Sequence, residues 1–231
     1  MNGYLSEEAG APQGCVLSPM LFSIYTNHMN LQTAVACLFK FADDMTLVGL
    51  QLNEDYLATY FSHVSLLNEW CEESFLEINV GKTKALVLDA RKTKTLLIPV
   101  KVNSERVTVV FNFKYLDTLI DNKLSFSDNS DLIYKKKSQQ RLYLLRKVRC
   151  FGVSRELLQI VYKSLVESVL TFNIVVWYEN LGAKRKAKLA RIVGMAGKTK
   201  DSPSELYLTA VEQKTARILD DAKHPLFSRF Q

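Results

Sequence analysis

Phe41-Ala42-Asp43-Asp44 places two adjacent carboxylates between two apolar segments, residues 34–39 and residues 45–50. Short apolar runs of this kind are typical of strands, so the sequence predicts a β-hairpin with Asp43 and Asp44 at its tip. Neighbouring carboxylates repel each other, and Mg²⁺ relieves this repulsion by binding carboxylate oxygens together with substrate phosphates. The pair therefore indicates metal-assisted phosphoryl transfer. For the dipeptide alone, an ordinary solvated turn is the alternative.

Three further segments flank the acidic pair in a fixed order. They are residues 10–22 (GAPQGCVLSPMLF), residues 67–84 with LNEW and LEINVGKTK at their two ends, and residues 113–117 (FKYLD). In this order, the segments resemble the later palm motifs of reverse transcriptases from non-LTR (LINE-type) retrotransposons. The resemblance continues through residues 139–146 to residues 224–227 (HPLF) and so covers nearly the whole chain.

The resemblance implies roles for individual residues. In that family the first Asp of the acidic pair binds the catalytic metal ions, which corresponds to Asp43 here, with Asp44 as a supporting ligand and Mg²⁺ as the cofactor. Gln13 and Gly14 match the turn that contacts template and nucleotide, where glycine permits close backbone approach. Lys82 matches a lysine proposed to protonate pyrophosphate in related polymerases. Without the resemblance, Lys82 is an ordinary turn lysine.

The later segment departs from the family at one position. Phe113, Lys114, Tyr115 and Leu116 match the residues that grip the primer strand, but the family usually has Gly next, where this chain has Asp117. Aspartate adopts left-handed backbone geometry less readily than glycine. Its carboxylate would also repel a primer phosphate. Both points argue against unchanged primer handling.

The family's palm also contains an earlier strand with another metal-binding Asp. Only nine residues precede Gly10, and the carboxylates before Asp43 are Glu7 and Glu8. We therefore expect a C-terminal fragment of an RNA-directed DNA polymerase that lacks the first catalytic strand and the fingers, and that is inactive as an isolated chain. Its expected partners are an RNA or DNA template–primer and the N-terminal polymerase half.

Charge is distributed unevenly along the chain. Residues 1–130 carry 10 Lys and Arg against 15 Asp and Glu, whereas residues 131–200 carry 16 against 4. Such a basic block predicts contact with a polyanion such as nucleic acid, and a solvated helix face is the alternative. The expected phosphate contacts are Lys135, Lys136, Lys137, Arg141, Arg146, Lys147, Arg149, Lys184, Arg185 and Lys186.

Hydrophobic periodicity predicts an α+β chain in two domains. Residues 1–128 combine the acidic hairpin and later strands with helices at residues 18–30 and 53–75, which fits a partial polymerase palm with helices on one face of an antiparallel sheet. Residues 129–231 show helical patterns without strand alternation, and by the resemblance they correspond to the basic helical thumb or connection domain of the family. Ser154 and Ser202-Pro203 are predicted helix starts there.

Residues 131–172 also resemble a short helical segment assigned to the N-terminal region of AlkB-like alkylation-repair proteins. The resemblance carries no oxygenase chemistry. An Fe(II) site of that kind needs His-x-Asp/Glu and a distant His, but His28, His63 and His224 are followed two residues later by Asn, Ser and Leu.

Cysteine usage and apolar run lengths bear on the compartment. The four cysteines lack paired spacing, which predicts reduced thiols in an intracellular protein, nuclear or cytoplasmic. Uninterrupted apolar runs are shorter than the ~20 residues of a membrane span, and no signal peptide opens the chain, so no membrane partner is expected.

Three functional interpretations remain open from the sequence. The chain is a fragment of a LINE-type reverse transcriptase, a non-catalytic nucleic-acid-binding or interaction module derived from one, or a degenerate reading frame without function. Upstream sequence encoding a further Asp-bearing strand would favour the first.

Overall fold

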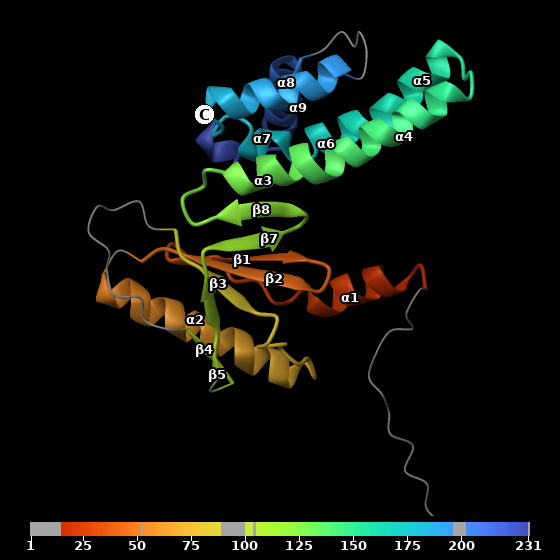
Figure 1. Cartoon of the computed structure of the whole chain (residues 1–231). Coiled ribbons are helices and arrows are strands. Elements are labelled where there is room, and N and C mark those ends of the chain that lie inside the picture. The colour runs from red at the N-terminus through yellow and green to blue at the C-terminus, as the bar shows by residue number, and fades with distance from the viewer. Residues whose placement is uncertain (1–14, 52, 89–99, 104, 196–201, 231) are drawn as a thin grey trace, which may run out of the picture. The chain divides into compact units, whose positions relative to one another are not determined.

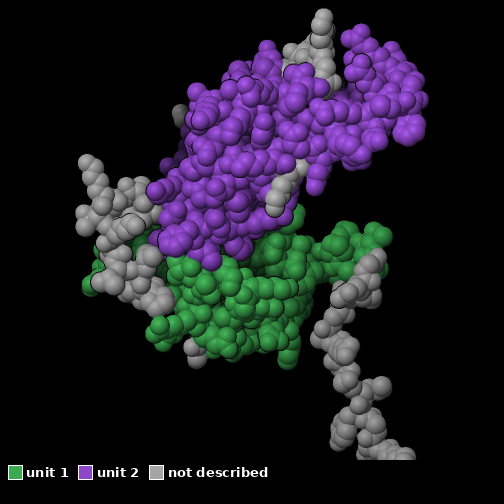
Figure 2. Space-filling model, viewed as in Figure 1, with its two compact units in different colours: residues 1–85, 95–109 green, residues 86–94, 110–231 purple. Residues whose placement is uncertain are grey.

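The structure is a computed structural model that describes residues 15–51, 53–88, 100–103, 105–195 and 202–230 (Figure 1). The chain divides into two compact units (Figure 2). Unit 1 comprises residues 1–85 and 95–109, and unit 2 comprises residues 86–94 and 110–231. The division at residues 109 and 110 lies earlier than the predicted boundary at 128 and 129, because the hairpin of residues 112–121 groups with the helices that follow it.

The described residues of unit 1 form two helices and short paired strands. Its elements are α1 (Ser18–Thr26), β1 (Ala36–Phe41), β2 (Asp44–Gly49), α2 (Glu54–Glu73), β3 (Lys84–Leu86), β4 (Lys101–Val102), β5 (Glu105–Arg106) and β6 (Thr108–Val110), of which β3 and β6 end one residue past the boundary. The side chain of Asn53 begins α2 by accepting a hydrogen bond from the Tyr56 N–H at 2.9 Å. Phe75, with a φ of 52°, follows its end.

The acidic hairpin packs on α2 through the inner faces of its strands. β1 and β2 pair antiparallel with Phe41 opposite Asp44, so only two residues form the turn. Ala36 and Leu38 of β1 are buried, and they cluster with partly buried apolar residues from β2 and α2. The predicted hairpin is therefore confirmed.

Unit 2 is one hairpin followed by helices. Its elements are β7 (Asn112–Tyr115), β8 (Thr118–Asp121), α3 (Ser127–Leu132), the π-helical segment Ile133–Ser138, α4 (Gln139–Cys150), α5 (Arg155–Tyr162), the π-helical segment Lys163–Glu167, α6 (Ser168–Thr171), α7 (Ile174–Trp177), α8 (Ala183–Met195), α9 (Pro203–Asp220) and a 3₁₀ turn, Phe227–Arg229. In Figure 1, α3 and α4 form one long ribbon beside α5 and α6.

The core of unit 2 is apolar and closely packed. Leu142, Val166, Leu170, Trp177 and Ile192 are each at most 1% exposed. Both predicted helix starts are confirmed, because their signals are local. The Ser154 hydroxyl accepts from the Leu157 N–H, and Ser202 forms a reciprocal capping box with Glu205.

The mixed α+β class is confirmed, but the strands differ from the predicted arrangement. Within the described residues they form four two-stranded pairs, β1–β2, β3–β6, β4–β5 and β7–β8, rather than one sheet. Three of these pairs join consecutive strands, so a local turn fixes their register.

One helical run among the described residues, Arg155–Trp177, is long and apolar enough to cross a membrane by length and composition alone. Uninterrupted apolar runs do not reveal this segment, because Lys163 and Glu167 interrupt it. Its mean hydropathy is nevertheless high enough for a membrane span. Core helices can pass the same test, and Val166, Leu170 and Trp177 of this run belong to the core of unit 2.

Candidate acidic hairpin and nucleic-acid interface

Asp43 and Asp44 lie where the chain reverses between β1 and β2. Asp43 is the second turn residue, and Asp44 is the first residue of β2; both are exposed. Ala42, the first turn residue, has a φ of 52°. Positive φ at this position suits a two-residue hairpin turn, but for a residue with a Cβ it costs roughly 1 kcal/mol. The turn therefore holds both carboxylates at one tip at some backbone cost.

The carboxylate pair is chemically suited to Mg²⁺ but does not enclose it. Mg²⁺ is usually held by one or two protein carboxylates, with waters and substrate phosphates completing its octahedron. Within the described ranges, no group of three His, Cys, Asp or Glu side chains could hold a metal ion. Asp43 and Asp44 thus fit a site that shares its ligands with other groups.

Lys40 anchors the hairpin to the end of α1 and to the segment that follows it. Its Nζ donates to the carbonyl oxygens of Thr26 and Met29, both at 2.6 Å. Burial lowers the pKa of Lys40 from its usual value. A cation at a helix C-terminus satisfies carbonyls that lack intrahelical partners. The sequence analysis missed this residue, although a lone lysine within an apolar strand signals a specific partner.

The other residues predicted around the acidic pair are only partly described. Gln13 and Gly14 lie outside the described residues. Lys82 is exposed, and its backbone N–H donates to Oδ1 of Asn79 at 3.0 Å in the turn before β3. Lys82 therefore lies in a turn, and its chemical role stays a prediction.

The predicted primer segment forms β7 and the turn that follows. Phe113, Lys114 and Tyr115 lie in β7, while Leu116 and Asp117 form a two-residue turn with φ values of 43° and 64°. Two positive values define the mirror-image turn that matches strand twist. Asp117 thus takes the left-handed geometry that glycine would take more easily.

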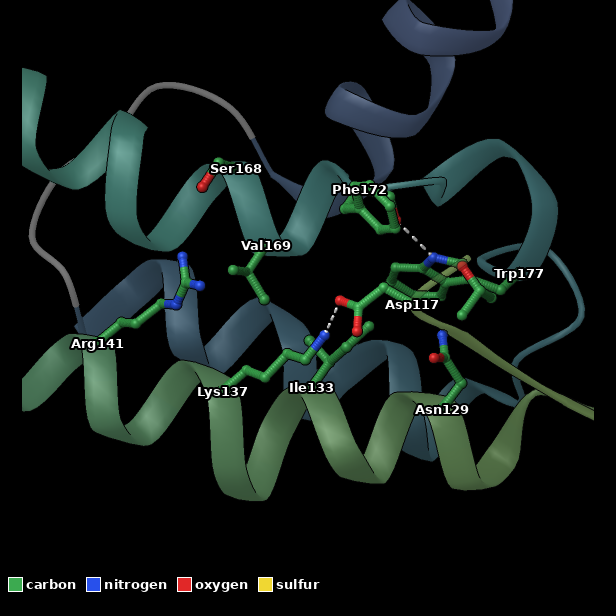
Figure 3. Close-up of a pocket in the computed structure, with 10 residues that line it drawn as sticks. Asp117, Asn129, Ile133, Lys137, Arg141, Ser168, Val169, Phe172 and Trp177 are labelled. Carbon is green, nitrogen blue, oxygen red and sulfur yellow. Dashed lines mark hydrogen bonds and ion pairs between the residues drawn. The ribbon is translucent and has the colours of Figure 1, made fainter. Parts of the chain in front are cut away.

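Two ammonium groups hold the Asp117 carboxylate. Lys114 Nζ lies 2.7 Å from Oδ1, and Lys137 Nζ contacts Oδ2 (Figure 3). Hydrogen bonds from Lys114 and Lys137 lower the pKa of Asp117. The expected repulsion of a phosphate is therefore offset within the molecule by two neighbouring cations.

The predicted phosphate-contacting residues differ in their exposure and in their protein partners. Four of them have partners within the protein. Lys135 lies 3.7 Å from Asp131, and Lys137 contacts Asp117. Arg141 donates to the Leu165 carbonyl at 2.7 Å, and Lys186 lies 3.1 Å from Glu179. Arg185 is half-buried, and the side chain of Lys136 lies outside the described part of the chain. Arg146, Lys147, Arg149 and Lys184 are exposed, and Lys135 is exposed despite its acidic neighbour.

A cavity of about 250 Å³ opens beside the Asp117–Lys137 pair (Figure 3). Lys137 and Arg141 reach it from one helix, and Val169, Phe172 and Trp177 form its apolar side. This cavity was not predicted from the sequence, because its walls come from three separate segments, residues 117–118, 129–141 and 168–177.

Comparison with known proteins gives three related polymerases. A probable RNA-directed DNA polymerase from transposon BS of Drosophila melanogaster is 26% identical over 190 residues, covering 73% of this chain and 20% of the relative. The RNA-directed DNA polymerase from mobile element jockey of Drosophila funebris is 31% identical over 134 residues, which cover 52% of this chain and 14% of the relative. The jockey polymerase of Drosophila melanogaster is 26% identical over 216 residues, which cover 86% of this chain and 22% of the relative.

The matched part of the chain covers between 14% and 22% of the length of these relatives. No solved structure matches it. Residues 128–168 match the family described as alkylated DNA repair protein alkB homolog 8, N-terminal, as the second resemblance predicted. Residues 2–144, more than half of the chain, match the family described as reverse transcriptase (RNA-dependent DNA polymerase). The resemblance of the ordered motifs is thereby confirmed, and the chain belongs to the reverse transcriptase family.

Proposed function

We propose that this chain is part of a non-LTR retrotransposon reverse transcriptase and supplies the acidic hairpin of its palm together with a basic helical thumb. The observation that carries this proposal is the two-residue turn that exposes Asp43 and Asp44 between β1 and β2. The family match over residues 2–144 and the transposon polymerases among the relatives support it. The proposed location is intracellular, nuclear or cytoplasmic, in agreement with free thiols at Cys37 and Cys71.

In the proposed site, Asp43 and Asp44 hold Mg²⁺ at the hairpin tip. A metal ion held there would supply Lewis-acid chemistry, polarising a primer 3′-hydroxyl and neutralising charge on the pyrophosphate that leaves. Lys40 orients the hairpin by binding backbone carbonyls at and after the end of α1. Gln13 and Gly14 are proposed to contact template and nucleotide, and Phe113 to Leu116 the primer strand.

Full catalysis requires at least one more carboxylate than this arrangement supplies. Two-metal phosphoryl transfer uses ions about 3.5–4 Å apart that share bridging ligands. The described residues offer Asp43 and Asp44 without a third acidic, histidine or cysteine ligand nearby. We therefore propose that the 231 residues alone are inactive and that a further polymerase segment completes the site.

Grafting tests this proposal directly. The chain replaces the matching segment of the jockey polymerase, and primer extension is measured with Mg²⁺. We expect extension by the graft and a loss of at least about 100-fold in Asp43→Asn, because one metal ligand is removed. Asp55→Asn, an exposed acidic residue in the first turn of α2, is the control. Equal activity of the Asp43→Asn and Asp55→Asn grafts would contradict the role of the hairpin.

A second candidate function is nucleic-acid binding without catalysis. The exposed cations Arg146, Lys147 and Arg149 at the end of α4, with Lys184 on α8, favour it. Phosphate contacts of this kind position a nucleic acid without reading its sequence. A graft that is inactive although the chain binds primer–template through these residues would favour this function over the first.

A further inference from the structure

The cavity in unit 2 combines cations, buried polar groups and an apolar wall. It is lined by Asp117, Thr118, Asn129, Ile133, Lys137, Arg141, Ser168, Val169, Phe172 and Trp177. Figure 3 shows Lys137 and Arg141 rising one helical turn apart toward the segment that carries Ser168 and Val169. The space of about 250 Å³ holds more than one water molecule and is large enough for a small ligand group.

One buried polar group in the wall has an unused donor. Asn129 is 2% exposed, and its Oδ1 accepts a hydrogen bond from the Leu119 N–H at 3.1 Å. This bond identifies the amide oxygen, so Nδ2 is the atom that remains. Asn129 Nδ2 is buried and has no hydrogen-bond partner. A buried donor left unpaired is costly, and an acceptor bound in the cavity would remove that cost.

Further donors face the same space. Arg141 uses Nη1 for the Leu165 carbonyl at 2.7 Å, which leaves most of its five N–H groups for a ligand. Thr118, 5% exposed, accepts from Asn173 Nδ2 at 3.0 Å, so its hydroxyl proton remains available to donate. The cavity therefore offers donors in excess of acceptors.

We propose that this cavity is a binding site for a phosphate monoester. Lys137, Arg141, the Asn129 amide and the Thr118 hydroxyl supply the donors, and Asp117 is an internal anion that competes with the ligand for Lys137. The ligand is a terminal phosphate, carried by a small molecule or by the 5′ end of a nucleic acid. A nucleic-acid source rests on the proposed function, whereas a small-molecule source does not.

The chemistry favours a dianion over other ligands. A phosphate monoester carries about −1.5 to −2 charges at pH 7 and three acceptor oxygens. Lys137 and Arg141 supply two positive charges, and the existing carboxylate neutralises only one of them. Arginine in particular recognises phosphate with two parallel hydrogen bonds. A terminal phosphate also enters a concave site more easily than a phosphate inside a continuous strand.

Asp117 makes the proposal testable in both directions. Its carboxylate is half-exposed and contacts the Lys137 ammonium. It therefore neutralises a positive charge that would otherwise attract the phosphate. Asp117→Asn removes this competing charge while preserving the side-chain shape. Phosphate affinity should then increase, whereas Lys137→Gln and Arg141→Gln should reduce it.

The experiment titrates the full chain at constant ionic strength and follows heat and tryptophan fluorescence, because Trp177 lines the cavity. The probes are inorganic phosphate and one short oligonucleotide prepared with a 5′-phosphate or a 5′-hydroxyl. We expect the 5′-phosphate form to bind about tenfold more tightly, as one charged hydrogen bond contributes. Arg141→Gln should remove this difference. Arg146→Gln, an exposed neighbour outside the cavity, should preserve it.

The outcomes separate this site from general nucleic-acid binding. Inorganic phosphate that binds in an Arg141-dependent way, with equal affinity for both oligonucleotides, supports the site with a small-molecule ligand. A 5′-phosphate preference lost in Arg141→Gln supports a nucleic-acid ligand. If neither phosphate nor the 5′-phosphate form binds in an Arg141-dependent way, and Asp117→Asn gains no affinity, the cavity is not a phosphate site, even if salt-sensitive nucleic-acid binding persists.

Discussion

The indole Nε1 of Trp70 donates a hydrogen bond to Nε2 of His28 at 2.6 Å. The two rings meet edge to face with centroids 5.4 Å apart. Trp70 lies near the end of α2 and is 8% exposed, while His28 follows α1 and is exposed. This contact links the segment after α1 to α2 across 42 residues of sequence, and it assigns both residues to packing rather than to metal binding.

Removing the indole donor should destabilise unit 1. Trp70→Phe preserves an aromatic ring but loses the hydrogen bond, so we expect the free energy of unfolding to fall by roughly 1–3 kcal/mol from the bond and the lost volume. His28→Ala should cost less. The coupling between the two changes, measured by urea unfolding of both single variants and the double variant, should be near 1 kcal/mol. If the changes in unfolding free energy of the two single variants add up to that of the double variant, the hydrogen bond between Trp70 and His28 contributes nothing to stability.

Gly49 permits the close approach of β2 to α2. A Cβ at this position would overlap Cδ2 of the Tyr60 ring and lie 2.6 Å from Cε2. We expect Gly49→Ala to destabilise the protein by about 1–3 kcal/mol, because the ring must move. Gly182→Ala is the control, since a Cβ there meets no atom within 4 Å. Combining Gly49→Ala with Tyr60→Ala should show less than additive loss in thermal unfolding. Full additivity would exclude the overlap as the cause.

Asp121 organises the chain between β8 and α3. Its carboxylate accepts from the N–H groups of Lys123, Ser125 and Phe126 at 3.0, 3.1 and 2.7 Å. Burial opposes the charge, but these backbone donors outweigh it and lower the pKa of Asp121. Asp121→Asn replaces one accepting oxygen by a donor and should cost about 1–3 kcal/mol. Asp220→Asn, exposed at the end of α9, is the control.

The lowered pKa of Asp121 also predicts the effect of acid. A carboxyl group whose folded pKa lies below its unfolded value of about 3.9 contributes its full stability above that value. The contribution is lost as the pH falls through the folded pKa. Urea unfolding between about pH 5 and pH 2 should therefore lose stability more steeply in the unaltered protein than in Asp121→Asn. If the stability of both proteins falls in parallel with pH, Asp121 is not the group that makes the fold sensitive to acid.

Features with local causes were predictable from the sequence. The acidic hairpin and the helix starts at Ser154 and Ser202 depend on residues within a few positions of each other. The strands of the hairpin were predicted at residues 34–39 and 45–50, but β1 and β2 reach further toward the tip. The difference arises at Ala42, whose positive φ closes the turn with two residues. Alanine seldom takes this geometry, so sequence alone favoured a longer turn.

Features with long-range causes were not predictable. The hairpin of β7 and β8 groups with the helices because Asn129 accepts from the Leu119 N–H and Asp117 pairs with Lys137. Neither pair has a sequence signature. The π-helical segment Ile133–Ser138 likewise lies within an apparently regular helical pattern. The cavity depends on all of these contacts, so it became visible only in the structure.

The exposed cations at the end of α4 should dominate nucleic-acid binding. Arg146, Lys147 and Arg149 are exposed, whereas Lys135 and Lys137 already contact Asp131 and Asp117. Replacing the first three with Gln should reduce the slope of log affinity against log salt on duplex DNA by up to about 3, at roughly 0.9 per phosphate contact. The triple Gln variant of residues 135–137 should reduce it less. If binding does not depend on salt, the basic residues between 131 and 200 form an ordinary solvated surface and do not contact phosphates.

Primer extension by the isolated chain tests the central claim, which is that these residues supply only part of a nucleotidyl-transfer site. The measurement is incorporation on poly(rA)/oligo(dT) with Mg²⁺ or Mn²⁺. We predict no template-directed incorporation, because Asp43 and Asp44 have no third ligand among the described residues. Incorporation by the unaltered chain that disappears in Asp43→Asn would show a complete catalytic site and contradict the account.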